Sequence, residues 1–154
     1  MTYFSEIVHL SDIARVHGDR CPEKKAFVFE DRVVTYKEFD INSEKVANGL
    51  VSENVAEQDR VAYMDKNSDR FYELVMGCAK SNSVIVGINW RLAPPEVAYI
   101  LNDSSAKILF VGEDFFGLVE KILKDVPTIE KVICMSGRNK NWPTYEAVSY
   151  THLT

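Results

Sequence analysis

Short apolar runs alternate with longer amphipathic segments along most of the chain. The apolar runs occupy residues 60–64, 83–88, 107–111 and 131–135, and the segments between them have apolar residues at helical spacing. Strands that alternate with helices of about 10–15 residues are typical of βαβ units. We therefore predict an α/β fold with a mainly parallel sheet and flanking helices.

Local signals place the helices between these strands. Residues 35–38 fit a capping box, in which a Thr hydroxyl and a Glu carboxylate each satisfy a free backbone N–H. This predicts a helix that ends near Glu53. Residues 67–69 form an N-cap cluster for the next helix, and two prolines at 94–95 begin another. A further helix is predicted over residues 113–124.

The N-terminal segment predicts a helix and a hairpin. Apolar residues at helical spacing indicate a helix over residues 10–17, with Ser11 as its N-cap. The β-rich runs 26–29 and 32–35 are separated only by the polar pair at 30–31. Two such runs around a two-residue turn predict an N-terminal β-hairpin.

The run 83–88 is the richest in β-branched residues, which predicts a buried interior strand. Trp90 and Arg91 follow it directly. Loops after the carboxyl ends of parallel strands are where ligands bind in open α/β sheets, and arginine suits an anionic group. Arg91 is therefore a candidate ligand residue, and the alternative of a surface charge beside a helix stays open.

Composition limits the class of protein. The chain has 154 residues, 46% of them hydrophobic, and a formal net charge of −5. These values are typical of one ordinary soluble domain. There is no Lys/Arg run, which argues against general nucleic-acid binding. The apolar stretches are too short for a transmembrane helix.

Cysteine usage and the N-terminus indicate a reducing compartment. Cys21, Cys78 and Cys134 are odd in number and widely spaced, which predicts free thiols. The start includes Glu6 and His9 and has no basic segment followed by an apolar run. We therefore expect no secretory signal and a cytoplasmic protein.

The residues alone offer little catalytic chemistry. The patterns GxGxxG, GxxxxGK[ST], GxSxG and HExxH do not occur. Asp12, Glu44 and Glu120 are predicted to lie on solvated surfaces. Cys78 lies on the apolar stripe of its helix, which predicts a core residue rather than a nucleophile. We assign no catalytic residue and no metal ligand.

Four stretches give the chain a family resemblance. Residues 89–104, Asn-Trp-Arg-Leu-Ala-Pro-Pro-Glu and onward, resemble the N-terminal part of acyl-CoA synthetases within the adenylate-forming family. Residues 34–39 resemble the first core motif of that family, 58–62 its Gly-Asp-Arg-Val-Ala strand entry, and 67–89 its second core motif. The four occur in the family's order and cover about residues 11–135.

The chain departs from the family pattern at four places. Phe39 replaces a leucine, Gln58 replaces a glycine, residues 80–83 read Lys-Ser-Asn-Ser instead of Lys-Ala-Gly-Ala, and Gly87 replaces a proline. Losses of Gly and Pro alter loop geometry more than chemistry. We therefore do not interpret them as loss of function.

The resemblance implies a fold, a reaction and one site residue. Residues 1–154 would be a single partial domain, the N-terminal portion of the large adenylate-forming domain, with an atypical tail at 136–154. The parent would use ATP, Mg²⁺ and CoA to convert a fatty or other carboxylic acid to an acyl-adenylate and then to a CoA thioester. Arg91 would contact the phosphorylated nucleotide end of CoA, and Trp90 favours a fatty or medium-chain acid.

The same resemblance implies that this chain alone is inactive. The family's Ser/Thr/Gly-rich phosphate loop, its ribose-binding Asp and its catalytic Lys are absent from these 154 residues, so we expect them downstream. A free-standing α/β module that binds a ligand or partner stays open as the alternative. A receiver-like module needs an acidic pair after its first strand, and the single Asp65 counts against that version.

Overall fold

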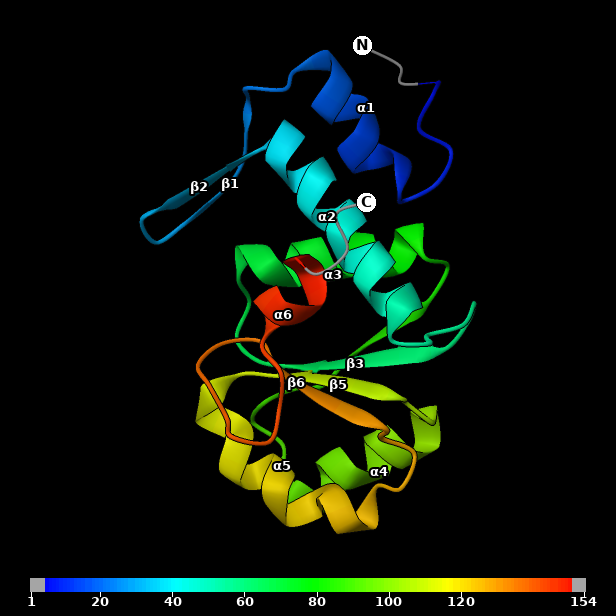
Figure 1. Ribbon diagram of the computed structural model, residues 1–154, viewed down its shortest axis with the longest axis vertical. Coiled ribbons are helices and arrows are strands. Elements are labelled where there is room, and N and C mark those ends of the chain that lie inside the picture. Colours follow the sequence, from blue (N-terminus) through cyan, green and yellow to red (C-terminus); the bar gives the residue numbers. More distant parts are fainter. Residues whose placement is uncertain (1–4, 151–154) are drawn as a thin grey trace.

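A four-stranded parallel sheet separates two helical layers (Figure 1). The computed structural model describes residues 5–150. The strands of the sheet are β3 (Arg60–Met64), β4 (Val84–Gly87), β5 (Ile108–Val111) and β6 (Lys131–Cys134). Their order is β4-β3-β5-β6, and every neighbouring pair is parallel. The prediction of an α/β fold with a mainly parallel sheet is confirmed.

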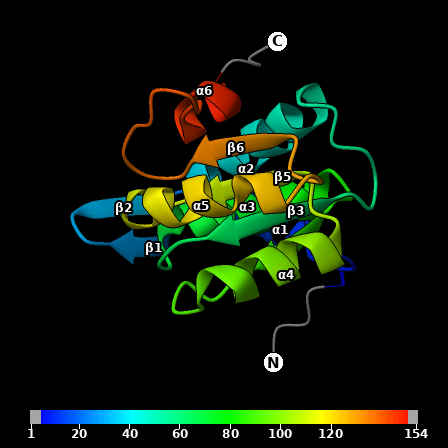
Figure 2. The same ribbon diagram turned by 90° about the horizontal axis from the view of Figure 1, so that it is seen from below.

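Helices cover both faces of the sheet. They are α1 (Asp12–Arg20), α2 (Tyr36–Ser52), α3 (Asp69–Lys80), α4 (Pro94–Ser104), α5 (Phe116–Ile122) and α6 (Tyr145–Tyr150), with 3₁₀ helices η1 (Glu113–Phe115) and η2 (Leu123–Asp125) on either side of α5. Figure 2 shows α4 and α5 on one face. The other face packs against α2, α3 and α6. The predicted helix over 113–124 is thus three short segments, and α6 was not predicted.

The N-terminal hairpin has the predicted form. Strands β1 (Lys25–Phe29) and β2 (Arg32–Thr35) pair antiparallel around a two-residue turn, in which Glu30 has a φ of 54°. The capping box after it is also confirmed. The Glu38 carboxylate accepts the Thr35 N–H at 2.8 Å, and the Thr35 hydroxyl accepts the Glu38 N–H at 3.2 Å. This exchange satisfies two backbone N–H groups at the start of α2.

The start of α1 differs from its predicted form. Ser11 lies at the N-cap position, but its side chain makes no capping hydrogen bond. The Asp12 carboxylate instead accepts the N–H groups of Val8 and His9, at 3.1 and 2.9 Å. These bonds, with one from Arg15, lower the pKa of Asp12 to about 2. Asp12 therefore organises the chain before α1 and is not a purely solvated charge.

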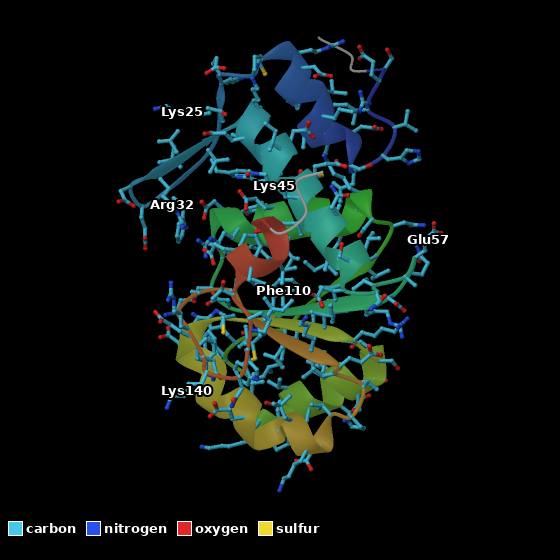
Figure 3. The ribbon with its side chains drawn as sticks, in the orientation of Figure 1. Lys25, Arg32, Lys45, Glu57, Phe110 and Lys140 are labelled. Atoms are coloured by element: carbon cyan, nitrogen blue, oxygen red, sulfur yellow. The ribbon has the colours of Figure 1, made fainter. Side chains whose placement is uncertain are left out.

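The sheet is buried on both faces, as β5 illustrates. Ile108 and Phe110 face α2, α3 and α6, whereas Leu109 and Val111 face α4 and α5. All four side chains are at most 2% exposed. Because successive side chains of a strand point to opposite faces, one strand supplies both cores. Figure 3 shows Phe110 at the level of the sheet, between the helical layers.

The prediction of an interior strand at 83–88 is wrong. Strand β4 lies at the edge of the sheet, and Val84 is 39% exposed. The interior positions belong to β3 and β5. A β-branched run shows that a segment suits a strand, but burial of that strand also depends on its neighbours, which a local pattern does not specify.

A buried carboxylate joins α6 to the rest of the molecule. Glu73 of α3 is 5% exposed and accepts hydrogen bonds from Asn42 of α2 at 2.8 Å and from the Tyr145 hydroxyl of α6 at 2.7 Å. Beside it, Arg70 donates to the carbonyl of Met135 at 3.0 Å. Because a buried carboxylate needs such partners, this network fixes where α6 docks.

This network predicts a pH-dependent loss of stability. Burial raises the pKa of Glu73 above its ordinary value of 4.5, although the hydrogen bonds from Tyr145 and Asn42 oppose the rise. Above pH 4.5 the unfolded chain releases a proton that the folded chain keeps, so the free energy of unfolding falls as pH rises toward the folded-state pKa. This fall in the free energy of unfolding can be measured by urea unfolding of the unsubstituted chain and of Glu73→Gln at pH values from 4 to 8. We expect the fall to be smaller in the variant.

The exposed Glu44 of α2 provides the matched control. Glu44→Gln should leave the pH dependence of the unfolding free energy unchanged, because Glu44 is exposed and its ion pair with Lys80 on the surface contributes little. Parallel profiles for the parent and Glu73→Gln would show that Glu73 ionises as readily in the folded chain as in the unfolded one.

Candidate ligand site at the carboxyl edge of the sheet

Three loops converge where the strands end. Lys66 follows β3, Trp90 and Arg91 follow β4, and Asp114 and Phe115 follow β5. The Trp90 ring lies 5.9 Å from the Phe115 ring, centroid to centroid, and 5.9 Å from the Lys66 ammonium nitrogen. We call these five residues the Trp90 cluster. The cluster lies at the C-terminal ends of the strands, where ligands bind in α/β proteins with parallel sheets.

Local hydrogen bonds hold the loop after β4 in place. The side-chain oxygen of Asn89 accepts the N–H of Arg91 at 3.0 Å, which turns the chain just before α4. The Glu96 carboxylate accepts the N–H of Ala93 at 2.8 Å, and Pro94 and Pro95 occupy the first turn of the helix. Trp90 and Arg91 are therefore presented by a loop that is anchored on both sides.

The cluster holds two cations against one aromatic ring. The Arg91 guanidinium carbon lies 4.2 Å from the centroid of the Trp90 ring, a cation–π stacking distance. Lys66 also forms an ion pair with Asp114 at 2.8 Å, and the two side chains are 61% and 58% exposed. The hydrogen bond that Lys66 donates to the Asp114 carboxylate raises the pKa of Lys66. Because solvent screens so exposed a pair, Asp114 holds Lys66 only weakly.

A charged cleft lies beside the cluster. It measures about 420 Å³ and runs between the hairpin turn and the sheet edge, with Asp65, Lys66 and Ser136 in its lining. The Ser136 hydroxyl lies 3.4 Å from the Asp65 carboxylate, and burial raises the pKa of Asp65. A Cβ at Gly112 would lie 2.1 Å from that carboxylate, so only glycine leaves room for Asp65 at its observed position.

Within residues 5–150, no three His, Cys, Asp or Glu side chains are grouped closely enough to hold a metal ion. We assign no residue of this part of the chain to Mg²⁺ and no reaction step to that ion.

The structure places the predicted site residue on the surface. Arg91 is exposed in the loop after β4, at the sheet edge that the sequence indicated. The same rule would have identified Lys66 and Asp114, which we did not single out, because they also follow strand ends. Arg91 stays a candidate, now with Lys66 beside the same ring.

Other side chains considered from the sequence have structural roles. Cys78 is 1% exposed, and burial raises its pKa to about 11, as expected of a core thiol. Glu44 and Glu120 are exposed, as predicted. Their contacts with Lys80 and Asn139 lie on the helix surfaces.

None of the helices in the described part of the chain has the length and apolar character that crossing a bilayer requires.

Comparisons with known proteins identify the family. The family model for AMP-binding enzymes matches residues 14–152. A fatty acid–[acyl-carrier-protein] ligase from Streptomyces coeruleorubidus is 42% identical over 106 residues, 69% of this chain and 20% of that protein.

Two solved structures show the same fold. A fatty acyl CoA synthetase of Mycobacterium tuberculosis has a TM-score of 0.80 at 31% identity, over 86% of this chain and 27% of that one. An anthranilate CoA ligase has a TM-score of 0.86 at 24% identity, over 96% of this chain and 28% of that one. The chain thus spans between a fifth and a third of the length of these proteins. It belongs to the AMP-binding enzyme family.

Proposed function

We propose that this chain is the N-terminal portion of an ATP-dependent ligase that joins a carboxylic acid to the thiol of CoA. Family membership supports the reaction class. The single observation that carries the CoA assignment is the Trp90 cluster, which presents Arg91 and Lys66 at the ligand-binding edge of the sheet. A guanidinium there suits a phosphate group, because it can donate two parallel hydrogen bonds.

The proposed reaction has two steps. The carboxylate oxygen attacks the α-phosphorus of ATP and releases pyrophosphate, which leaves an acyl-adenylate. The CoA thiolate then attacks the acyl carbon, and AMP leaves as the new thioester forms. ATP and Mg²⁺ belong to the first step, and we assign no residue of this chain to either. Arg91 contributes to the second step by binding the nucleotide end of CoA.

Arg91→Ala tests this assignment. In the full-length protein that contains this chain, the substitution should weaken CoA binding by about 1–3 kcal/mol, since it removes a charge-assisted contact with phosphate. Formation of the adenylate should barely change. Acid-dependent pyrophosphate release and thioester formation, measured separately, distinguish the two steps.

The exposed Arg15 of α1 offers a control, because it lies outside the Trp90 cluster. Arg15→Ala should leave both steps unchanged. Equal loss of both steps in Arg91→Ala would show that Arg91 supports the fold rather than CoA, and the assignment would be wrong.

A second acceptor is favoured by one observation. The relative that is 42% identical is a fatty acid–[acyl-carrier-protein] ligase. An assay in which CoA and a carrier protein with a free thiol compete for one activated acid distinguishes the two acceptors. Preferential transfer to CoA supports the main proposal, and transfer to the carrier protein alone supports the second.

A further inference from the structure

Lys66 comes from a different loop than Arg91 but lies beside the same ring. Its ammonium nitrogen is 5.9 Å from the Trp90 centroid, and the Arg91 guanidinium carbon is 4.2 Å from it. Strands β3 and β4 are hydrogen-bonded neighbours, so the loops that follow them start side by side. The sheet therefore places two cations beside one aromatic ring, at the C-terminal ends of its strands.

The two cations differ in how they are held. Arg91 stacks on the indole and has its backbone N–H bonded to Asn89. Lys66 is 61% exposed and paired with the equally open Asp114. An arginine on a ring is pre-organised, whereas lysine is a point charge on a flexible stem that can change partner. Arg91 is thus the fixed cation and Lys66 the movable one.

We propose that Lys66 is the second cation for the 3′-phosphate of CoA, and that Asp114 holds Lys66 until this phosphate replaces it. The proposal rests on the proposed function, in which Arg91 binds the nucleotide end of CoA. A phosphate monoester has close to two negative charges at neutral pH, which one arginine balances only in part. Lys66 supplies the second positive charge.

The exchange of partners is physically reasonable because both members of the ion pair are solvated. Asp114 is already 58% exposed while it is paired, so when Lys66 turns to the phosphate water solvates the carboxylate and no buried charge is left alone. Asp114 also repels an incoming anion. It therefore lowers the affinity for CoA, although it lies beside the binding residues.

Calorimetric titration of the full-length protein with CoA and with dephospho-CoA, which lacks the 3′-phosphate, tests this role. Lys66→Ala should weaken CoA binding roughly tenfold, the loss expected for one charge-assisted contact. The same variant should bind dephospho-CoA as the parent does. Lys66→Arg should restore most of the CoA affinity, since it keeps the positive charge.

Asp114→Asn gives a result of opposite sign. With the competing carboxylate removed, CoA should bind several times more tightly, whereas a structural role for the ion pair would make both Asp114→Asn and Lys66→Ala weaken binding. Lys124 in η2, an exposed lysine at the far end of α5, supplies the control. Lys124→Ala should leave both titrations unchanged.

Two results would overturn the role of Lys66. One is equal weakening of CoA and dephospho-CoA by Lys66→Ala, and the other is no effect on either. Neither result would contradict the proposed function. That function is tested by acid-dependent pyrophosphate release and thioester formation in the unsubstituted protein. Absence of both reactions there would refute the ligase assignment, whatever the titrations give.

Discussion

Residues 1–154 on their own should form no acyl-adenylate. Nucleotide phosphates are bound in proteins by glycine-rich loops whose backbone N–H groups surround them, together with a neutralising lysine. The seven glycines of this chain are scattered, with no two closer than five positions. Positioning supplies several kcal/mol of an enzyme's lowering of the barrier, and these residues leave ATP unpositioned. Incubation with ATP, Mg²⁺, CoA and a panel of fatty and aryl acids should release no pyrophosphate.

The comparison needed is a boiled sample of the same chain and a full-length family member assayed in parallel. Acid-dependent pyrophosphate above the boiled sample would contradict the expectation. It would mean that the cleft beside Asp65, or another part of the described chain, binds ATP without a glycine-rich loop. The alternative of a free-standing module makes the same prediction for activity, so that module is tested by ligand binding instead.

The fold was predictable wherever the signal is local. The capping box at Thr35 and Glu38 satisfies backbone groups within four residues, so the local sequence pattern specifies the hydrogen bonds that form. The hairpin was also predictable from local sequence, because only two residues join its paired strands. The four strands of the sheet also begin and end within one residue of the predicted runs, since β-branched residues between polar loops leave little choice.

Features set by distant residues were not predictable in this way. Strand β4 is at the edge because β5 and β6 lie on the other side of β3. The sequence of residues 83–88 does not specify this order of strands. Helix α6 has only six residues, too few to be stable alone. It is held by Tyr145, whose partner Glu73 is far away in the sequence.

The candidate site shows the same division. The rule that ligands bind at the carboxyl ends of strands identified the loop of Arg91 and could have identified Lys66. The stacking of Arg91 on Trp90 and the pairing of Lys66 with Asp114 depend on side-chain geometry across three loops. Sequence spacing contains no measure of those distances.

Phe110→Ala should cost the chain about 3–5 kcal/mol of unfolding free energy, the range for truncating a buried phenylalanine. Phe110 is 1% exposed and lies on the interior strand β5. It packs in the core shared by α2, α3 and α6, with the Tyr145 ring 6.4 Å away between centroids. Because neighbours on every side are fixed by the sheet and helices, the cavity cannot close fully. The midpoint and slope of urea unfolding measure the loss.

A change of that size removes a large part of the roughly 5–15 kcal/mol that keeps a domain folded. The matched control is Tyr99→Ala on α4, another aromatic truncation, at a side chain that is 68% exposed. It should alter the unfolding free energy by no more than about 0.5 kcal/mol, because an exposed ring loses little on truncation. Equal losses in the two variants would show that the core beneath α6 is loosely packed in solution. In that case the packing of Phe110 against the Tyr145 ring would contribute little to the stability of the chain.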